Sequence, residues 1–141
     1  SIAHDITILQ VVRGEAAWEQ IQQAYQFNSP AQAGTEYLLI QVRMDYSSGP
    51  EGQTDWVHQL DFGLLSTQGH SYGIPWWLTP PEPFLTAQLY PGSTITGWTA
   101  WQVAIDDPNP MLIFGLDSFY RSKAYFSTAS VDTEEEVTPE A

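Results

Sequence analysis

The sequence predicts an all-β domain, a sandwich or barrel of about seven or eight short strands with one helix near the N-terminus. Segments rich in β-branched and aromatic residues alternate with turns made of Gly, Pro, Asn and Asp. One stretch alone, residues 15–25, has a helical period, and strands do not alternate with helices as in a parallel sheet. With 141 residues, the chain is long enough to bury a hydrophobic core as a single domain.

The N-terminal part is expected to form one strand and then the helix. Ile and Val predominate in residues 2–12, which favours a strand, and Gly14 ends that pattern. Acidic Glu15 and Glu19 fall in the early turns of the helix, where the helix dipole favours negative charge. The apolar residues of this helix recur at three- and four-residue spacing and form one face: Ala17, Trp18, Ile21, Ala24 and Tyr25. We expect this face, with Trp18, to dock the helix on the sandwich.

The rest of the chain is expected to form strands only, over residues 37–44, 56–65, 71–72, 84–90, 93–105, 111–116 and 124–128. Trp98 lies three positions before Trp101, so the two rings should face opposite sides of one strand, with Trp98 pointing outward or lying under a loop. The alternating side chains that should meet between two sheets are Leu38, Ile40, Val42, Met44, Phe62, Leu64, Trp101, Val103 and Ile105.

The charge of the chain excludes several classes of function. Four Lys and Arg stand against 17 Asp and Glu, the formal net charge is -13, and no Lys or Arg lies between Arg43 and Arg121. Binding to nucleic acid or to an anionic membrane needs clustered Lys and Arg, so neither is expected. No stretch approaches the ~20 apolar residues of a membrane-spanning helix. The lack of cysteine excludes thiol catalysis and disulfides.

Composition also separates the C-terminus from the domain. Residues 130–141 are acidic and poor in apolar side chains, so they are predicted to be a tail or linker that adds little stability to a domain of residues 1–129. An acidic, Lys-poor surface is typical of proteins outside the cell. The start at Ser1 without an initiator Met fits a processed or truncated protein.

Several spaced motifs resemble one family. They are residues 13–19, Phe27-Asn28, Gly34-x-Glu36-Tyr37-Leu38-Leu39, Phe62-x-Leu64-x4-Gly69-x2-Tyr72, Tyr90-Pro91-Gly92-x4-Gly97-Trp98-x2-Trp101-x-Val103 and Asp106-Asp107-Pro108-Asn109-Pro110. Together they resemble the telokin-like, immunoglobulin-like domain of unknown function of bacterial secreted proteins and lipoproteins, which is similar to the immunoprotective extracellular antigen domain. The resemblance implies an immunoglobulin-like β-sandwich with one short inserted helix, an exported location and a non-catalytic role.

Residues suited to catalysis or metal binding are sparse. His4, His58 and His70 lack the spacing of a metal-binding pair, and His4 and His70 are expected at the surface. Neither Gly-x-Ser-x-Gly nor Ser-x-x-Lys is present, so no enzyme is expected. Ca²⁺ is the more reasonable ion, and its weak candidate ligands are Asp106, Asp107 and Asn109. An Asx turn closed by the same side chains is the favoured interpretation of that segment.

The loop over residues 73–83 carries the functional prediction. Its four prolines prevent a regular strand, and Trp76 and Trp77 depart from what the family leads us to expect. Aromatic side chains on a stiff loop suit protein or glycan contact, although the loop could equally pack on its own domain. We therefore expect a non-catalytic, extracytoplasmic interaction module that binds an envelope protein partner; the alternative is a small-ligand or calcium-binding accessory domain. The expected contact residues are Trp76, Trp77, Leu78 and Phe84.

Overall fold

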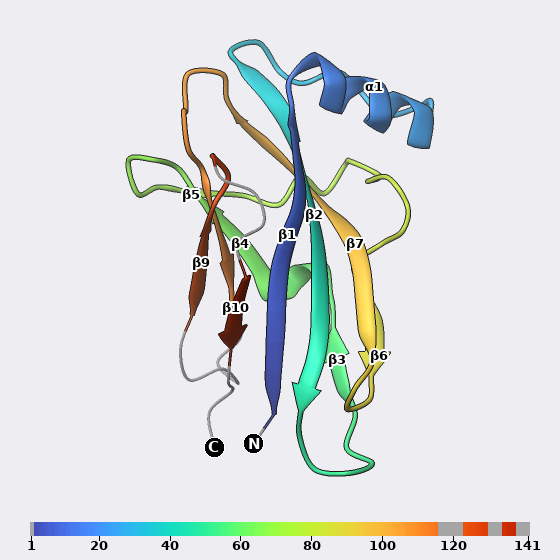
Figure 1. Ribbon diagram of the computed structural model, residues 1–141. Helices are drawn as coiled ribbons and strands as arrows, with labels where there is room; N and C mark the ends of the chain where they lie inside the picture. The colour runs from blue at the N-terminus through green and yellow to red at the C-terminus, as the bar shows by residue number, and fades with distance from the viewer. Residues whose placement is uncertain (1, 116–122, 130–133, 138–141) are drawn as a thin grey trace.

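The computed structural model describes residues 2–115, 123–129 and 134–137, and its architecture is a β-sandwich (Figure 1). Two four-stranded antiparallel sheets, with strand orders β10-β1-β2-β7 and β5-β4-β8-β9, enclose one core, and a two-stranded ribbon β3-β6 adjoins them. The predicted all-β sandwich with one short helix is confirmed.

The first sheet contains the long strands. It consists of β1 (Ala3–Arg13), β2 (Thr35–Ser48), β7 (Thr94–Ala104) and the short β10 (Glu134–Val137). β2 lies between β1 and β7 and pairs with each over about its whole length. A register shift between Ile8 and Gln10 marks an irregularity in β1. All of these strands except β10 lie where the sequence predicts them.

The second sheet is made of short strands. It contains β4 (Phe62–Leu65), β5 (Ser71–Tyr72), β8 (Met111–Phe114) and β9 (Ala124–Ser127), while β3 (Asp55–Val57) and β6 (Ala87–Leu89) form the ribbon. The strand predicted over residues 56–65 is divided by a 3-10 turn, Gln59–Asp61. A capping box stabilises this turn, in which the Asp61 carboxylate accepts a hydrogen bond from the His58 backbone N–H at 3.0 Å.

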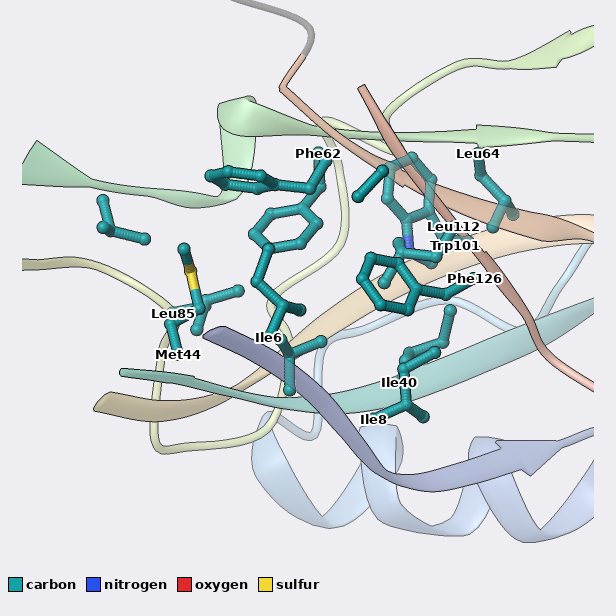
Figure 2. Packing of buried hydrophobic residues seen from close by; sticks show 14 of the residues in the cluster. Ile6, Ile8, Ile40, Met44, Phe62, Leu64, Leu85, Trp101, Leu112 and Phe126 are labelled. Carbon is teal, nitrogen blue, oxygen red and sulfur yellow. The ribbon is translucent and has the colours of Figure 1, made fainter. Parts of the chain in front are cut away.

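The inner core contains the alternating side chains that the sequence predicts. Phe62 and Leu64 of the second sheet face Ile40 and Trp101 of the first (Figure 2). Ile105 is the exception, because β7 ends at Ala104 and the following residue is 57% exposed in a turn. That turn is closed by a hydrogen bond from the Asp107 N–H to the Ala104 carbonyl.

His4 corrects a second expectation, since it is fully buried rather than at the surface. It points inward from β1, like Ile6, and its Nε2 lies 3.0 Å from Oδ2 of Asp55 on β3. Its ring contacts those of Tyr46 and Phe114, with centroids 5.4 and 6.2 Å away. A carboxylate partner makes the burial of an imidazole tolerable in the core.

A second apolar cluster lies on the outer face of the first sheet, where helix α1 (Glu15–Ala24) covers β1 and β2. Trp98 lies in this cluster and Trp101 in the inner core, which confirms that the two rings face opposite sides. Trp18 docks the helix as predicted, stacked on Tyr37 with ring centroids 6.1 Å apart.

Four residues of the C-terminal segment form a strand that its composition does not suggest. Glu134–Val137 forms β10, which pairs antiparallel with His4–Thr7 of β1. The domain boundary at residue 129 remains a prediction, but the expectation that residues 130–141 are a tail or linker is wrong for these four residues, which pair with the domain. Backbone hydrogen bonds do not depend on apolar side chains, which is why composition does not reveal this strand.

Deleting residues 134–141 should therefore lower the free energy of unfolding by about 1 kcal/mol or more, because backbone hydrogen bonds contribute about 0.5–1.5 kcal/mol each. Urea titration of the truncated and full chains measures this difference. Deleting residues 138–141 alone leaves β10 in place and should have less effect. Equal stability of the longer truncation and the full chain would contradict the pairing.

Gly97→Ala should destabilise the fold by about 1–3 kcal/mol, because it forces backbone shifts in a packed region. A Cβ at Gly97 would lie 2.6 Å from the backbone nitrogen of Leu85, where residues 84–85 cross β7. Gly73→Ala is the matched control, since its Cβ would meet no atom within 4 Å. Thermal melts that place both variants at the same midpoint would disprove the close approach.

Candidate functional site: the tryptophan turn

Trp76 and Trp77 occupy the corner of a turn, here called the Trp turn (residues 75–78). The Leu78 N–H donates to the Pro75 carbonyl at 3.1 Å and closes the turn. Trp76 is 78% exposed and Trp77 55%, whereas Pro75 and Leu78 are buried. In an extended chain neighbouring side chains point to opposite sides, but the corner of a turn lets both rings project. The structure thus decides between exposure and packing in favour of exposure.

Leu78 anchors the turn to the domain. It packs with Ala17 and Ile21 of α1 and with Trp98 of β7 in the outer cluster. Leu78 is one of the four expected contact residues, and the structure places it beneath the turn, where it supports the exposed rings. Pro75 and Leu78 thus fix both ends of the turn against the body of the domain.

Asn28 ties the same loop to the end of the helix. Its amide donates to the carbonyls of Ile21 at 3.0 Å and Thr79 at 2.9 Å, and its Oδ1 accepts the Thr79 N–H at 2.9 Å. The pair of bonds to Thr79 matches the pattern of a backbone ladder. Because Asn28 is buried, this link is protected from water and holds the loop firmly.

Two further exposed aromatic rings lie close in sequence to Asn28, which is bonded to the loop of the Trp turn at Thr79. Tyr25 and Phe27 pack edge to face, with centroids 5.4 Å apart, directly before Asn28. In Figure 1 the loop after β5 passes beside β7, below α1. We call Tyr25, Phe27, Trp76 and Trp77 the aromatic surface. Sequence analysis missed the first two: it placed Tyr25 on the packed helix face, but α1 ends at Ala24 and Tyr25 turns outward.

Phe84 lies at the other end of the loop, where the chain enters the ribbon. It is half-exposed and forms an isolated bridge with Trp98 of β7, while the Trp98 N–H donates to the Pro83 carbonyl at 3.1 Å. Phe84 is thus separated from the Trp turn by residues 79–83. Its side chain belongs to a different row of exposed residues on the β6 segment.

Among the Lys and Arg side chains of the described residues, exposed Lys123 lies directly before β9 of the other sheet, and the two Arg side chains already have partners. Arg13 is engaged by the Glu36 carboxylate at 2.7 Å and by the carbonyls of Ala104 and Asp107. Arg43 lies on β2 beside Asp45, 3.5 Å away. Glu82, in the same loop as the Trp turn, is exposed. The aromatic surface therefore lies in a neutral to negative field.

The turn proposed as a weak calcium candidate is closed by its own hydrogen bonds. Buried Asp107 accepts bonds from the Tyr72 hydroxyl at 2.6 Å, from the Asn109 N–H at 3.2 Å, and from both the N–H and the hydroxyl of Thr67. Asn109 Oδ1 accepts bonds from Ser127, Thr128 and Ala129. Only Asp106 projects outward. These bonds favour the Asx turn, because the oxygens a cation would need already have protein donors.

Hydrogen bonding also sets the acidity of this turn. Burial raises the pKa of the Asp107 carboxyl, but the hydrogen bonds from Thr67, Tyr72 and Asn109 outweigh it, so its pKa lies below the ordinary value. Burial, followed by the bond to Asp107, raises the pKa of Tyr72. An open hollow of about 250 Å³ lies beside them, lined by Ser66, Thr67, Gln68, Tyr72, Ala104, Asp106, Asp107 and Pro108.

Among the described residues, no group of three or more His, Asp and Glu side chains is placed to hold a metal ion, so the histidines form no metal centre there. His58 lies 3.9 Å from Asp61, and His70 is exposed in the turn before β5. Within the same described ranges, no helix is both long and apolar enough to cross a membrane.

Asp107→Asn should lower the free energy of unfolding by about 1–3 kcal/mol at pH 7, because an amide cannot accept all of these bonds. A carboxyl with a depressed folded pKa stabilises the fold above its unfolded pKa, and this contribution is lost as the pH falls through the folded pKa. The gap between wild type and variant should therefore narrow below about pH 4. Urea titrations from pH 3 to 7 test this. The exposed neighbour provides the control, Asp106→Asn, and a gap independent of pH would contradict the assignment.

Comparison with known proteins shows a shared fold. The chain is similar to the crystal structure of a "putative lipoprotein (ycdA)" from Bacillus subtilis, with a TM-score of 0.62 and 13% identity. The likeness covers 93% of this chain but 36% of that protein, so the chain spans about a third of its length. At this identity the likeness establishes the fold alone. No protein-family model matches the chain, and no curated protein matches it significantly. The resemblance to the telokin-like family thus stays a prediction.

Proposed function

We propose that this domain is a non-catalytic interaction module of an exported, envelope-associated protein, of the telokin-like, immunoglobulin-like type, and that it binds a protein partner through the aromatic surface. The observation that carries the proposal is the exposure of Trp76 and Trp77 on a turn whose two ends are buried. An exposed apolar group costs free energy in water, so a rigid turn that presents two such rings is typical of a contact site.

Rigidity favours binding through this surface. The prolines of the loop, the buried Leu78 and the bonds between Asn28 and Thr79 fix the Trp turn before any partner arrives. Little conformational entropy is then lost on association, which leaves more of the contact energy for affinity. Trp and Tyr are also the residues most often found among those that dominate binding energy.

The charge indicates the kind of protein partner. Glu82 is exposed in the loop, and the chain as a whole has a net charge of -13. A partner that carries Arg or Lys around an apolar patch would be attracted and oriented by this field, and its association rate should fall as salt increases. The shared fold with a protein described as a lipoprotein supports an envelope setting.

The double variant Trp76→Ser/Trp77→Ser should lose partner binding at least tenfold and keep its fold, because both side chains project into solvent. Partners are captured from envelope extracts of the source cells on immobilised wild-type domain, and binding of the purified partner is then measured by surface plasmon resonance at two salt concentrations. Circular dichroism reports the fold.

Tyr125→Ser is the control, because Tyr125 is an exposed aromatic residue on β9 of the other sheet. It should bind like the wild type. A folded double variant that binds as well as the wild type would contradict the proposal, and so would unfolding of the double variant, which would show that the rings hold the fold.

A further inference from the structure

The outer face of the β3-β6 ribbon carries a second set of exposed aromatic residues, separate from the Trp turn. Burial alternates along residues 84–90: Leu85, Ala87 and Leu89 point into the core, whereas Phe84, Thr86, Gln88 and Tyr90 are exposed. On β3, Trp56 is 60% exposed and lies directly opposite Gln88. We call Trp56, Phe84, Thr86, Gln88 and Tyr90, together with Thr54, the ribbon row.

The ribbon row places rings and hydrogen-bonding groups in alternation. Phe84 and Tyr90 lie at its two ends, and Trp56 lies beside its middle. Between the rings, the Gln88 amide donates to the Thr54 hydroxyl at 2.8 Å, which orients the amide along the surface. Thr86 adds another hydroxyl. Amide and hydroxyl groups each both donate and accept hydrogen bonds.

No member of the ribbon row is charged, although the chain is strongly acidic. The nearest carboxylate along β3, that of Asp55, turns to the opposite side, where it pairs with buried His4. The ribbon therefore keeps its charge on the inner face and leaves a neutral outer face. An anionic polymer would still be repelled by the net charge of the chain, whereas an uncharged one would not.

The dimensions fit a narrow ligand. The paired part of the ribbon is three residues long, about 10 Å, and its two strands are about 10 Å wide. That area is far below the roughly 800 Å² that each partner contributes to a stable protein interface. A flexible linear polymer needs no wider surface, since each of its units contacts only the part of the row beneath it.

We propose that the ribbon row binds a neutral, linear polysaccharide. Sugar rings present C–H faces that pack on aromatic rings and equatorial hydroxyl groups that exchange hydrogen bonds with amides and hydroxyls, and the ribbon row offers both in alternation. The site is distinct from the aromatic surface in its residues and in its ligand, so the two can be tested separately.

Affinity electrophoresis of the whole chain tests the proposal, with native gels that contain hydroxyethyl cellulose, galactomannan or dextran as neutral probes. Carboxymethyl cellulose supplies the first of these backbones with negative charge. Wild-type protein should be retarded by at least one neutral polymer and not by the anionic one. Trp56→Ser/Tyr90→Ser should weaken the binding at least tenfold, and Gln88→Ala several-fold with the fold unchanged.

The Trp76→Ser/Trp77→Ser variant should keep full retardation, which separates this site from the protein-binding surface. Absence of retardation by all three neutral polymers would overturn the proposal, as would retardation that survives the ribbon substitutions. The alternative, that the ribbon row joins two copies of the chain, is tested by sedimentation velocity. A wild-type dimer that Trp56→Ser/Tyr90→Ser converts to a monomer would also overturn the proposal.

Discussion

Strand β2 is buried on both of its faces near the helix, and the rest of the structure is arranged around that requirement. Its inward side chains, such as Leu38 and Ile40, meet the second sheet. Its outward side chains Tyr37 and Leu39 need a separate cover, which α1 and Leu78 supply. The Trp turn is therefore held in place by the same apolar contacts that complete the fold. A change that loosens the Trp turn would therefore also remove apolar contacts that stabilise the fold.

Much of the fold could be predicted because strand alternation reports directly on burial. The inward residues of β2, β4 and β7 are found where period-two patterning places them. The failures are local. His4 is a polar residue in a strand, so the sequence pattern does not indicate that it is buried. Its partner Asp55 is distant in sequence, and the pair makes the burial of the imidazole possible. Glu134–Val137 pairs through its backbone, which side-chain composition does not report. The 3-10 turn at Gln59–Asp61 is stabilised by a capping box.

The candidate site was predictable in its residue types and less so in its geometry. Four prolines identify a stiff loop, and the tryptophans within it are visible in the sequence. Both rings are exposed on a turn that is closed by the hydrogen bond between Leu78 and Pro75. Phe27 is brought to the aromatic surface by the hydrogen bond between the neighbouring Asn28 and Thr79. The ribbon row needs the pairing of β3 with β6, which joins residues 55–57 to 87–89. Such long-range pairings are what a single sequence leaves open.

The pairing of His4 with Val137 brings the first and last described strands together. The first described strand begins where the last one ends, so His4 and Val137 lie at the same pole of the sandwich. Helix α1 follows the far end of β1, at the opposite pole (Figure 1). The helix, and the aromatic rings beside its last turn, therefore lie the full length of β1 away from His4 and Val137, about 35 Å for its eleven residues.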